Sequence, residues 1–170
     1  YKTLAGGFIG LCSTVTSTTA SKFSVVLDAS FGVGSLSALA MSKELEDTAS
    51  GLLTMDIRNA ARTGPVNEGC GAEKVQKEVV PPCGVSSETD AGKTLVSFDG
   101  DADRVVFHTF PTAGSTDWKL LDGDKIACLF AVCLLEELQA AQLSATDVRL
   151  GCVQTAYANG ASSDYLRSQN

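Results

Sequence analysis

The sequence predicts an α/β fold in which a mixed β-sheet is flanked by helices. Short apolar runs of the kind that form buried strands alternate with segments of helical periodicity, as in layered α/β domains. Segments rich in glycine, proline or Ser/Thr separate these elements, as turns and loops do. The chain has 170 residues, which is enough for one well-buried domain and a small remainder. The strands of the main domain are expected at 23–27, 52–57, 95–98 and 105–110.

Residues 1–22 are expected to form a linker helix and a loop that lead from a missing upstream domain. Residues 1–11 have helical periodicity, although three glycines weaken it. The Ser/Thr-rich segment that follows, 13–24, has the composition of a loop. The main domain is therefore predicted to begin at Phe23.

Residues 23–45 are predicted to form a buried strand, a tight loop with Gly32 and Gly34, and a helix at 36–45. Such a unit can cradle a phosphate on the helix N-terminus. However, the dinucleotide fingerprint needs a third glycine where Ser37 stands, so a plain strand-to-helix turn is favoured. The side chains expected to face inward are Leu36, Leu39 and Ala40.

Residues 58–94 are predicted to be mostly irregular, with one short helix at 72–77. The strands at 95–98 and 105–110 are expected to be neighbours that flank a short loop. His108 lies on the second of these strands, several residues past the loop. It is predicted to be a structural histidine with satisfied hydrogen bonds rather than a general base.

The C-terminal part is predicted to begin with a long helix at 126–138. This helix is apolar nearly all round, so it should be sandwiched between other elements. Asp122 and Asp124 precede it and fit turn and N-cap roles better than a second metal pair. A strand at 148–154 is expected to follow.

A Ser/Thr/Asp-rich segment at 144–147 is predicted to divide the chain. The metal-binding α/β domain would occupy 23–146, and 147–170 would be the truncated start of a following α/β domain. The final helix would be capped by Ser162 or Ser163.

Composition disfavours several kinds of partner. A net charge of −7 without a basic patch argues against nucleic acid. No basic region leads into a continuous apolar stretch, so neither a signal peptide nor a membrane span is predicted. One histidine and six cysteines without CxxC spacing disfavour zinc and favour reduced thiols in a cytoplasmic protein. The cysteines are Cys12, Cys70, Cys83, Cys128, Cys133 and Cys152.

The loop at 99–104, Asp-Gly-Asp-Ala-Asp-Arg, is the strongest chemical signal in the chain. With about 6 Å between neighbouring carboxylates and an effective dielectric of about 20, each adjacent pair repels by about 3 kcal/mol, which favours a compensating cation. Because alternate residues of a strand stand about 6.5 to 7 Å apart, the loop must curl to share one ion. Gly100 and Ala102 permit that curl.

Oxygen ligands of this kind suit Mg²⁺, Mn²⁺ or Ca²⁺. The predicted metal ligands are therefore Asp99, Asp101 and Asp103. Arg104, directly beside them, would face a phosphate, which a guanidinium can bind with a two-pronged fork.

Three other interpretations of this loop compete with the metal site described above. An EF-hand is rejected because its sixth position needs glycine and its twelfth needs glutamate, where Arg104 and Phe110 stand. An aspartyl nucleophile of the phosphatase type, at Asp101 or Asp103, stays open. A solvated acidic turn between two strands also stays open.

The aspartate loop after an apolar strand resembles the metal loop of the alpha-D-phosphohexomutases. Other motifs narrow the resemblance to the branch of that family that acts on N-acetylglucosamine phosphates, and their order and spacing hold from about 25 to 166. These motifs are Asn67 with Cys70, Gly71 and Ala72; Pro81 and Pro82 with Gly84; and the runs 121–127 and 153–160.

The resemblance implies an isomerase that interconverts N-acetylglucosamine 6-phosphate and 1-phosphate through a 1,6-bisphosphate, on the route to UDP-N-acetylglucosamine. In this family a phosphoserine donates the phosphoryl group, and a bound Mg²⁺ neutralises charge on that group during transfer. By position, Asp99, Asp101 and Asp103 match the metal ligands, and Arg104 matches the residue on the phosphate side.

The family's phosphoserine loop has no full counterpart in this sequence. Thr19, Ala20 and Ser21 begin like that loop, but the histidine and asparagine that follow in the family are absent, so Ser21 is not expected to be the nucleophile. The 170 residues alone are expected to bind metal without turnover. Two alternatives stay open: another phosphohexomutase, of the phosphoglucomutase type, or a non-catalytic module that binds a divalent metal.

Overall fold

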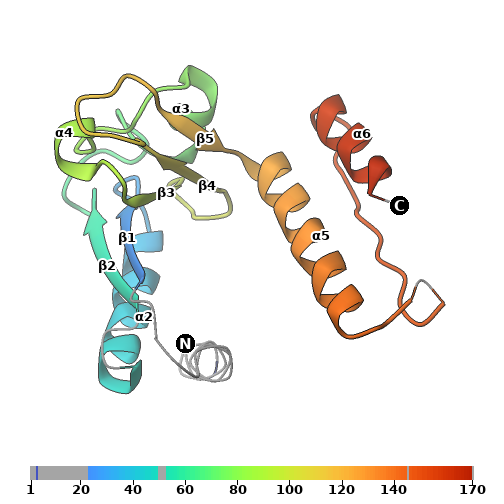
Figure 1. Cartoon of the computed structure of the whole chain (residues 1–170). Helices are drawn as coiled ribbons and strands as arrows, with labels where there is room; N and C mark the ends of the chain where they lie inside the picture. The colour runs from blue at the N-terminus through green and yellow to red at the C-terminus, as the bar shows by residue number, and fades with distance from the viewer. Residues whose placement is uncertain (1–2, 4–22, 50–52, 145, 170) are drawn as a thin grey trace. The chain divides into compact units, whose positions relative to one another are not determined.

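The computed structural model describes residues 3, 23–49, 53–144 and 146–169 (Figure 1). The chain divides into two compact units, Tyr1–Leu120 and Leu121–Asn170, which are described separately below. The linker helix and loop predicted at 1–22, with Cys12 and Ser21, lie outside the described residues apart from Thr3.

The first unit is built on a five-stranded sheet with the strand order β2-β1-β3-β4-β5 (Figure 1). β1 pairs in parallel with β2 and β3, whereas β3 pairs antiparallel with β4. The mixed sheet confirms the predicted fold class, although the short β5 was not predicted. The strands are β1 (Phe23–Asp28), β2 (Leu53–Arg58), β3 (Thr94–Phe98), β4 (Val105–Thr109) and β5 (Lys119–Leu121).

The strand register brings the carboxyl ends of β1, β2 and β3 to one edge of the sheet. Asp28, the last residue of β1, pairs with Arg58 of β2 and with Ser97 of β3. The loops that leave these strands touch, since the Phe31 amide donates to the carbonyl of Asn59 at 2.6 Å. In α/β sheets ligands bind at this carboxyl edge.

Helices cover both faces of the sheet, as predicted. α2 (Gly34–Ala49) packs on one face of the sheet, and α3 (Ala72–Glu78) packs on the other. The short α4 (Ser87–Asp90) lies in the segment that connects α3 to β3. Successive strand residues point to opposite faces, which separates the two cores. One core contains Leu27, Ala38 and Val96, and the other contains Ala72, Val75 and Val106.

The expectation that α2 buries Leu36, Leu39 and Ala40 is wrong, because all three are exposed. α2 begins so close to the sheet that a Cβ on Gly34 would lie 2.8 Å from the Phe98 ring. Small side chains therefore occupy the buried side of its first turns, since larger ones would overlap the sheet. Within 34–45, the part of α2 whose burial is described, the buried residues are Gly34, Ser35, Ala38, Ser42 and Leu45.

The second unit contains α5 (Gly123–Ala140) and α6 (Gly160–Ser168), which contact each other. Asp122 is the N-cap of α5, and its carboxylate accepts a hydrogen bond from the Lys125 amide at 3.1 Å. Asp124 accepts from the Asn159 amide at 2.8 Å. The first contact confirms the cap role predicted for Asp122, whereas Asp124 bonds to Asn159, the N-cap residue of α6, and not within a local turn.

Three expectations for the second unit are wrong. No side chain of α5 is buried among the described residues, so the helix is not sandwiched there. Residues 148–154 form no strand, because the described part of this unit offers no strand with which they could pair. Asn159, rather than Ser162 or Ser163, caps α6, and its side chain accepts from the Ala161 amide at 2.9 Å.

The two compact units divide at Leu121, before α5, whereas the sequence predicted a division after this helix, at 147. Contacts between α5 and α6 group the long helix with the C-terminal residues. In the described part of the chain, no helix combines the length and the apolar character needed to cross a membrane.

Candidate metal centre

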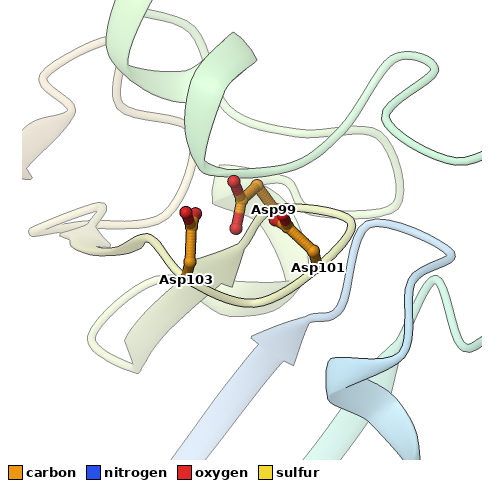
Figure 2. A group of neighbouring side chains, drawn as sticks. All are labelled: Asp99, Asp101 and Asp103. Atoms are coloured by element: carbon orange, nitrogen blue, oxygen red, sulfur yellow. The ribbon is translucent and has the colours of Figure 1, made fainter.

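β3 ends in a loop that brings three carboxylates together, and Figure 2 shows their side chains pointing toward one another. One oxygen from each of Asp99, Asp101 and Asp103 lies within 4.8 Å of the other two. Ala102 adopts a left-handed φ of 61°, and its amide donates to the carbonyl of Asp99 at 3.1 Å. Because oxygens on opposite sides of one Mg²⁺ or Ca²⁺ stand about 4 to 5 Å apart, this spacing fits a shared ion.

The loop after β1 supports the aspartate loop through backbone contact. The Val33 amide donates to the carbonyl oxygen of Gly100 at 3.0 Å. A Cβ on Gly32 would lie 2.2 Å from that oxygen, and a Cβ on Gly100 would lie 2.3 Å from the Val66 side chain. The two loops can therefore approach this closely only with glycine at both positions. The positive φ of the aspartate loop is at Ala102 instead.

A buried carboxylate at the end of β1 ties the supporting loops together. Asp28 is 1% exposed, and its Oδ1 accepts from the Ser30 amide at 3.0 Å and from Asn59 Nδ2 at 2.8 Å. Its Oδ2 accepts from the Gly71 amide at 2.8 Å, and Ser30 Oγ donates to Asn67 Oδ1 at 2.7 Å. Sequence reasoning missed this role, although an acidic residue directly after a buried strand was a usable signal.

Asp99 is buried, unlike the other two aspartates of the cluster. Burial opposes its ionisation, but hydrogen bonds from the side chain and backbone of Arg104 outweigh burial and keep the pKa of Asp99 below its usual value. The pKa of Asp103 is raised by a hydrogen bond with Asp99 and by the charges of Asp101 and Asp99. This crowding of negative charge is what a bound cation would relieve.

Arg104 lies beside the aspartates, as predicted, but its guanidinium is already paired with carboxylates. Nε donates to Asp99 Oδ2 at 2.7 Å, and Nη2 donates to Glu73 Oε2 of α3 at 3.0 Å. Both hydrogen bonds raise the pKa of Arg104. Among the described residues, Nη1 has no partner. Sequence reasoning assigned no role to Glu73, whose only visible feature was its place in the first turn of a predicted helix.

His108 is a buried structural histidine, which confirms the prediction. Trp118 Nε1 can only donate, and it contacts His108 Nδ1 at 3.2 Å. The proton of the neutral ring is therefore on Nε2, which donates to Ser97 Oγ at 3.0 Å. Burial lowers the pKa of His108 to about 4, so the ring is neutral at physiological pH.

Comparison with protein families matches residues 122–170 to the model described as phosphoacetylglucosamine mutase AMG1, domain III. The phosphoacetylglucosamine mutase of Arabidopsis thaliana is 51% identical over 118 residues, which are 68% of this chain and 21% of that protein. The phosphoacetylglucosamine mutase of Mus musculus is 39% identical over 163 residues, which are 96% of this chain and 28% of that protein.

Comparison with solved structures finds the same kind of mutase. The substrate complex of N-acetylglucosamine-phosphate mutase, a member of the alpha-D-phosphohexomutase superfamily, matches with a TM-score of 0.78 and 31% identity, over 98% of this chain and 30% of that one. Aspergillus fumigatus N-acetylphosphoglucosamine mutase in complex with GlcNAc-6P and magnesium matches with a TM-score of 0.77 and 30% identity, over 97% of this chain and 32% of that one.

The fold and the aspartate loop define a member of the alpha-D-phosphohexomutase superfamily. Within that superfamily, the chain belongs to the phosphoacetylglucosamine mutases. It spans between 21% and 32% of the length of the relatives described above.

Proposed function

We propose that this chain is the metal-binding portion of a phosphoacetylglucosamine mutase. The complete enzyme would interconvert N-acetylglucosamine 6-phosphate and 1-phosphate through a phosphoserine and a 1,6-bisphosphate. The observation that carries this proposal is the convergence of Asp99, Asp101 and Asp103 at the carboxyl edge of a sheet that has this family's fold.

The donor set and the local charge support Mg²⁺ as the ion of this site. The cluster and its ion-paired neighbours contain four carboxylates and two cations, a formal surplus of two negative charges that one divalent ion would neutralise. Oxygen-only ligands suit Mg²⁺, which keeps several waters when the protein supplies few ligands. The carboxylates belong to Glu73, Asp99, Asp101 and Asp103, and the cations belong to Lys77 and Arg104.

The three aspartates and Arg104 would have different tasks. Asp99 is fixed in direction by two hydrogen bonds from Arg104, whereas Asp101 and Asp103 are exposed and complete the ligand set from the solvent side. When bound, the ion would neutralise charge on a phosphoryl group. Arg104 Nη1 would donate a charge-assisted hydrogen bond to a phosphate oxygen.

In the complete enzyme, we expect Asp99→Ala or Arg104→Ala to lower turnover by about thirty- to a thousandfold, the effect of losing about 2 to 4 kcal/mol of transition-state stabilisation. The assay follows conversion of the 6-phosphate to the 1-phosphate, coupled to uridylyltransfer, with bisphosphate and Mg²⁺ supplied. Asp117→Ala is the control, because Asp117 is exposed and pairs with Lys119 outside the cluster. Near wild-type turnover by either site variant would contradict the proposal.

The isolated 170-residue chain should bind metal without turnover. Phosphoryl transfer needs donor, metal and acceptor in line, and effective molarity is lost when the donor serine is absent. Clear turnover by the isolated chain would contradict the proposal that this chain binds the metal but does not supply the phosphoryl donor.

We also propose a cytoplasmic location and a place on the route to UDP-N-acetylglucosamine. Free thiols support the location, since the five cysteines in the described part of the chain are unpaired. Thiol counting in denaturant without reductant should find nearly all of the six cysteines free, and a count near zero would contradict the location.

A further inference from the structure

We propose that Glu73 is a positioning residue that sets the direction in which Arg104 Nη1 is presented to an anionic ligand. This inference rests on the proposed function of the aspartate loop, because it assigns the ligand's phosphate to that site. Glu73 is in the first turn of α3, and it reaches the loop through a 3.0 Å hydrogen bond from Arg104 Nη2 to its Oε2.

The geometry of the guanidinium explains why this contact matters. The group is planar and rigid, so fixing two of its nitrogens also fixes the direction of the third. Asp99 holds Nε at 2.7 Å, and Glu73 holds Nη2 at 3.0 Å. Nη1 is the nitrogen left without a partner in the described part of the chain. Nη1 therefore keeps both of its hydrogens for a ligand and points in a fixed direction, whereas Nη2 has one hydrogen bonded to Glu73 and one left.

Glu73 is itself held on a rigid element. Its second oxygen, Oε1, pairs with Lys77 one helical turn further along α3. The helix is anchored beneath it by Ala72 and Val75, which are 1% and 0% exposed. The chain enters α3 at Gly71, whose amide is bonded to the buried Asp28. The position of Oε2 is thus set by the same contacts that organise the supporting loops.

If Glu73 contributed only to stability, or only a negative charge, its substitution would affect anion binding differently from the loss of a positioning residue. The side chains of Arg104 and Glu73 are 45% and 40% exposed, and ion pairs at such exposure contribute little to folding. The negative charge of Glu73 would repel an anion bound nearby, so by charge alone its removal should tighten anion binding. A positioning role predicts that loss of the hydrogen bond weakens binding despite the removal of that charge.

Two substitutions separate these roles. Glu73→Gln removes the charge but keeps an oxygen that can accept from Nη2, whereas Glu73→Ala removes both. Glu78→Ala is the matched control, because Glu78 forms the same kind of i,i+4 ion pair on α3, with Lys74, and does not pair with Arg104. Each variant of the 170-residue chain would be titrated with Mn²⁺ and then, with metal bound, with inorganic phosphate.

A second measurement needs neither metal nor activity. ¹⁵N NMR of the guanidinium reports rotation about the Nε–Cζ and Cζ–Nη bonds, and the Arg104 signals would be assigned by their loss in Arg104→Lys. We expect separate Nη1 and Nη2 signals in the wild type, Glu73→Gln and Glu78→Ala. In Glu73→Ala the two signals should merge, because Nη2 would no longer be held.

For phosphate, we expect Glu73→Ala to weaken binding at least about fivefold, equal to about 1 kcal/mol, while Glu73→Gln binds as tightly as the wild type or more tightly. Equal behaviour of Glu73→Ala and Glu78→Ala would overturn the inference, as would separate Nη signals in Glu73→Ala. Failure of the wild type to bind Mn²⁺ would instead contradict the proposed metal function, and the NMR result would still decide whether Glu73 positions Arg104.

Discussion

The aspartate-loop edge of the first unit and helix α5 of the second unit differ in how their side chains are held. At the edge, Asp28 and Asp99 are buried, and each of their carboxylate oxygens accepts a hydrogen bond within the first unit. α5 is rich in large apolar residues, yet none of its side chains is buried among the described residues. The geometry of the metal site therefore depends on contacts within the first unit, and metal binding should be a property of that unit.

The largest effect should come from breaking the buried ion pair between Arg58 and Asp90. Arg58 donates from both terminal nitrogens to the fully buried carboxylate, at 2.7 and 2.8 Å, and keeps the pKa of Asp90 well below its usual value. Arg58→Met should lower the free energy of unfolding of the first unit by about 3 to 5 kcal/mol, because Asp90 loses its main partner. Urea titration followed by Trp118, the only tryptophan of the chain, reports this unit.

Lys93→Met is the matched control for this prediction. Lys93 also pairs with Asp90, at 3.0 Å, but its side chain is 41% exposed. Its loss should cost less than about 1 kcal/mol. Equal losses in the two variants would show that the Arg58 pair is not the contact that holds this edge.

The second effect is a pH dependence due to His108, the only histidine of the chain. The unfolded ring takes up a proton near pH 6.5, whereas the folded ring resists it down to a pKa of about 4. The unfolding free energy should therefore be undiminished above about pH 6.5 and fall by about 3 kcal/mol as the pH drops to about 4.

His108→Gln tests this assignment because it removes the titrating ring. Urea titrations followed by Trp118 fluorescence at pH 7, 6, 5 and 4.5 would compare the slopes of stability against pH. The variant should lose most of the dependence in this window. The same slope in both proteins would mean that another group causes it.

The smallest effect is expected on α5, and it sharpens the comparison between the two regions. Val75 of α3 is 0% exposed, whereas Phe130 of α5 is 65% exposed. Val75→Ala should cost about 2 kcal/mol. Phe130→Ala should cost less than about 0.5 kcal/mol, although it removes the larger side chain. Circular dichroism during urea unfolding measures both, and an equal or larger loss in Phe130→Ala would show that α5 is packed.

Sequence patterns predicted the structure well where the interacting partners lie inside the chain. The strands around the aspartate loop were predicted because each has a neighbour in the same sheet, and the loop was recognised because its three ligands are contiguous in sequence. The segment 148–154 has an equally strand-like composition but no neighbouring strand in the described part of its unit. A strand prediction depends on a partner that composition does not reveal.

Contacts between distant segments could not be predicted from local pattern. The pairing of Glu73 with Arg104 joins residues that are 31 positions apart, and Asp28 contacts Gly71 across 43 positions. The inward face of α2 was also mistaken, because the close approach at Gly34 favours small residues over the leucines that periodicity selects. These features depend on how distant loops and helices pack against one another in the folded chain.

The most direct test of the metal site is a Mn²⁺ titration of the 170-residue chain, followed by water-proton relaxation. Asp101→Asn removes one anionic ligand at an exposed position, so the fold should persist, and Asp117→Asn is the control at an exposed aspartate paired with Lys119. We expect the wild type and Asp117→Asn to bind one equivalent equally well, and Asp101→Asn to bind at least about tenfold more weakly, a difference of about 1.4 kcal/mol. Equal binding by the wild type and Asp101→Asn would contradict the assignment of the aspartate loop as the metal site.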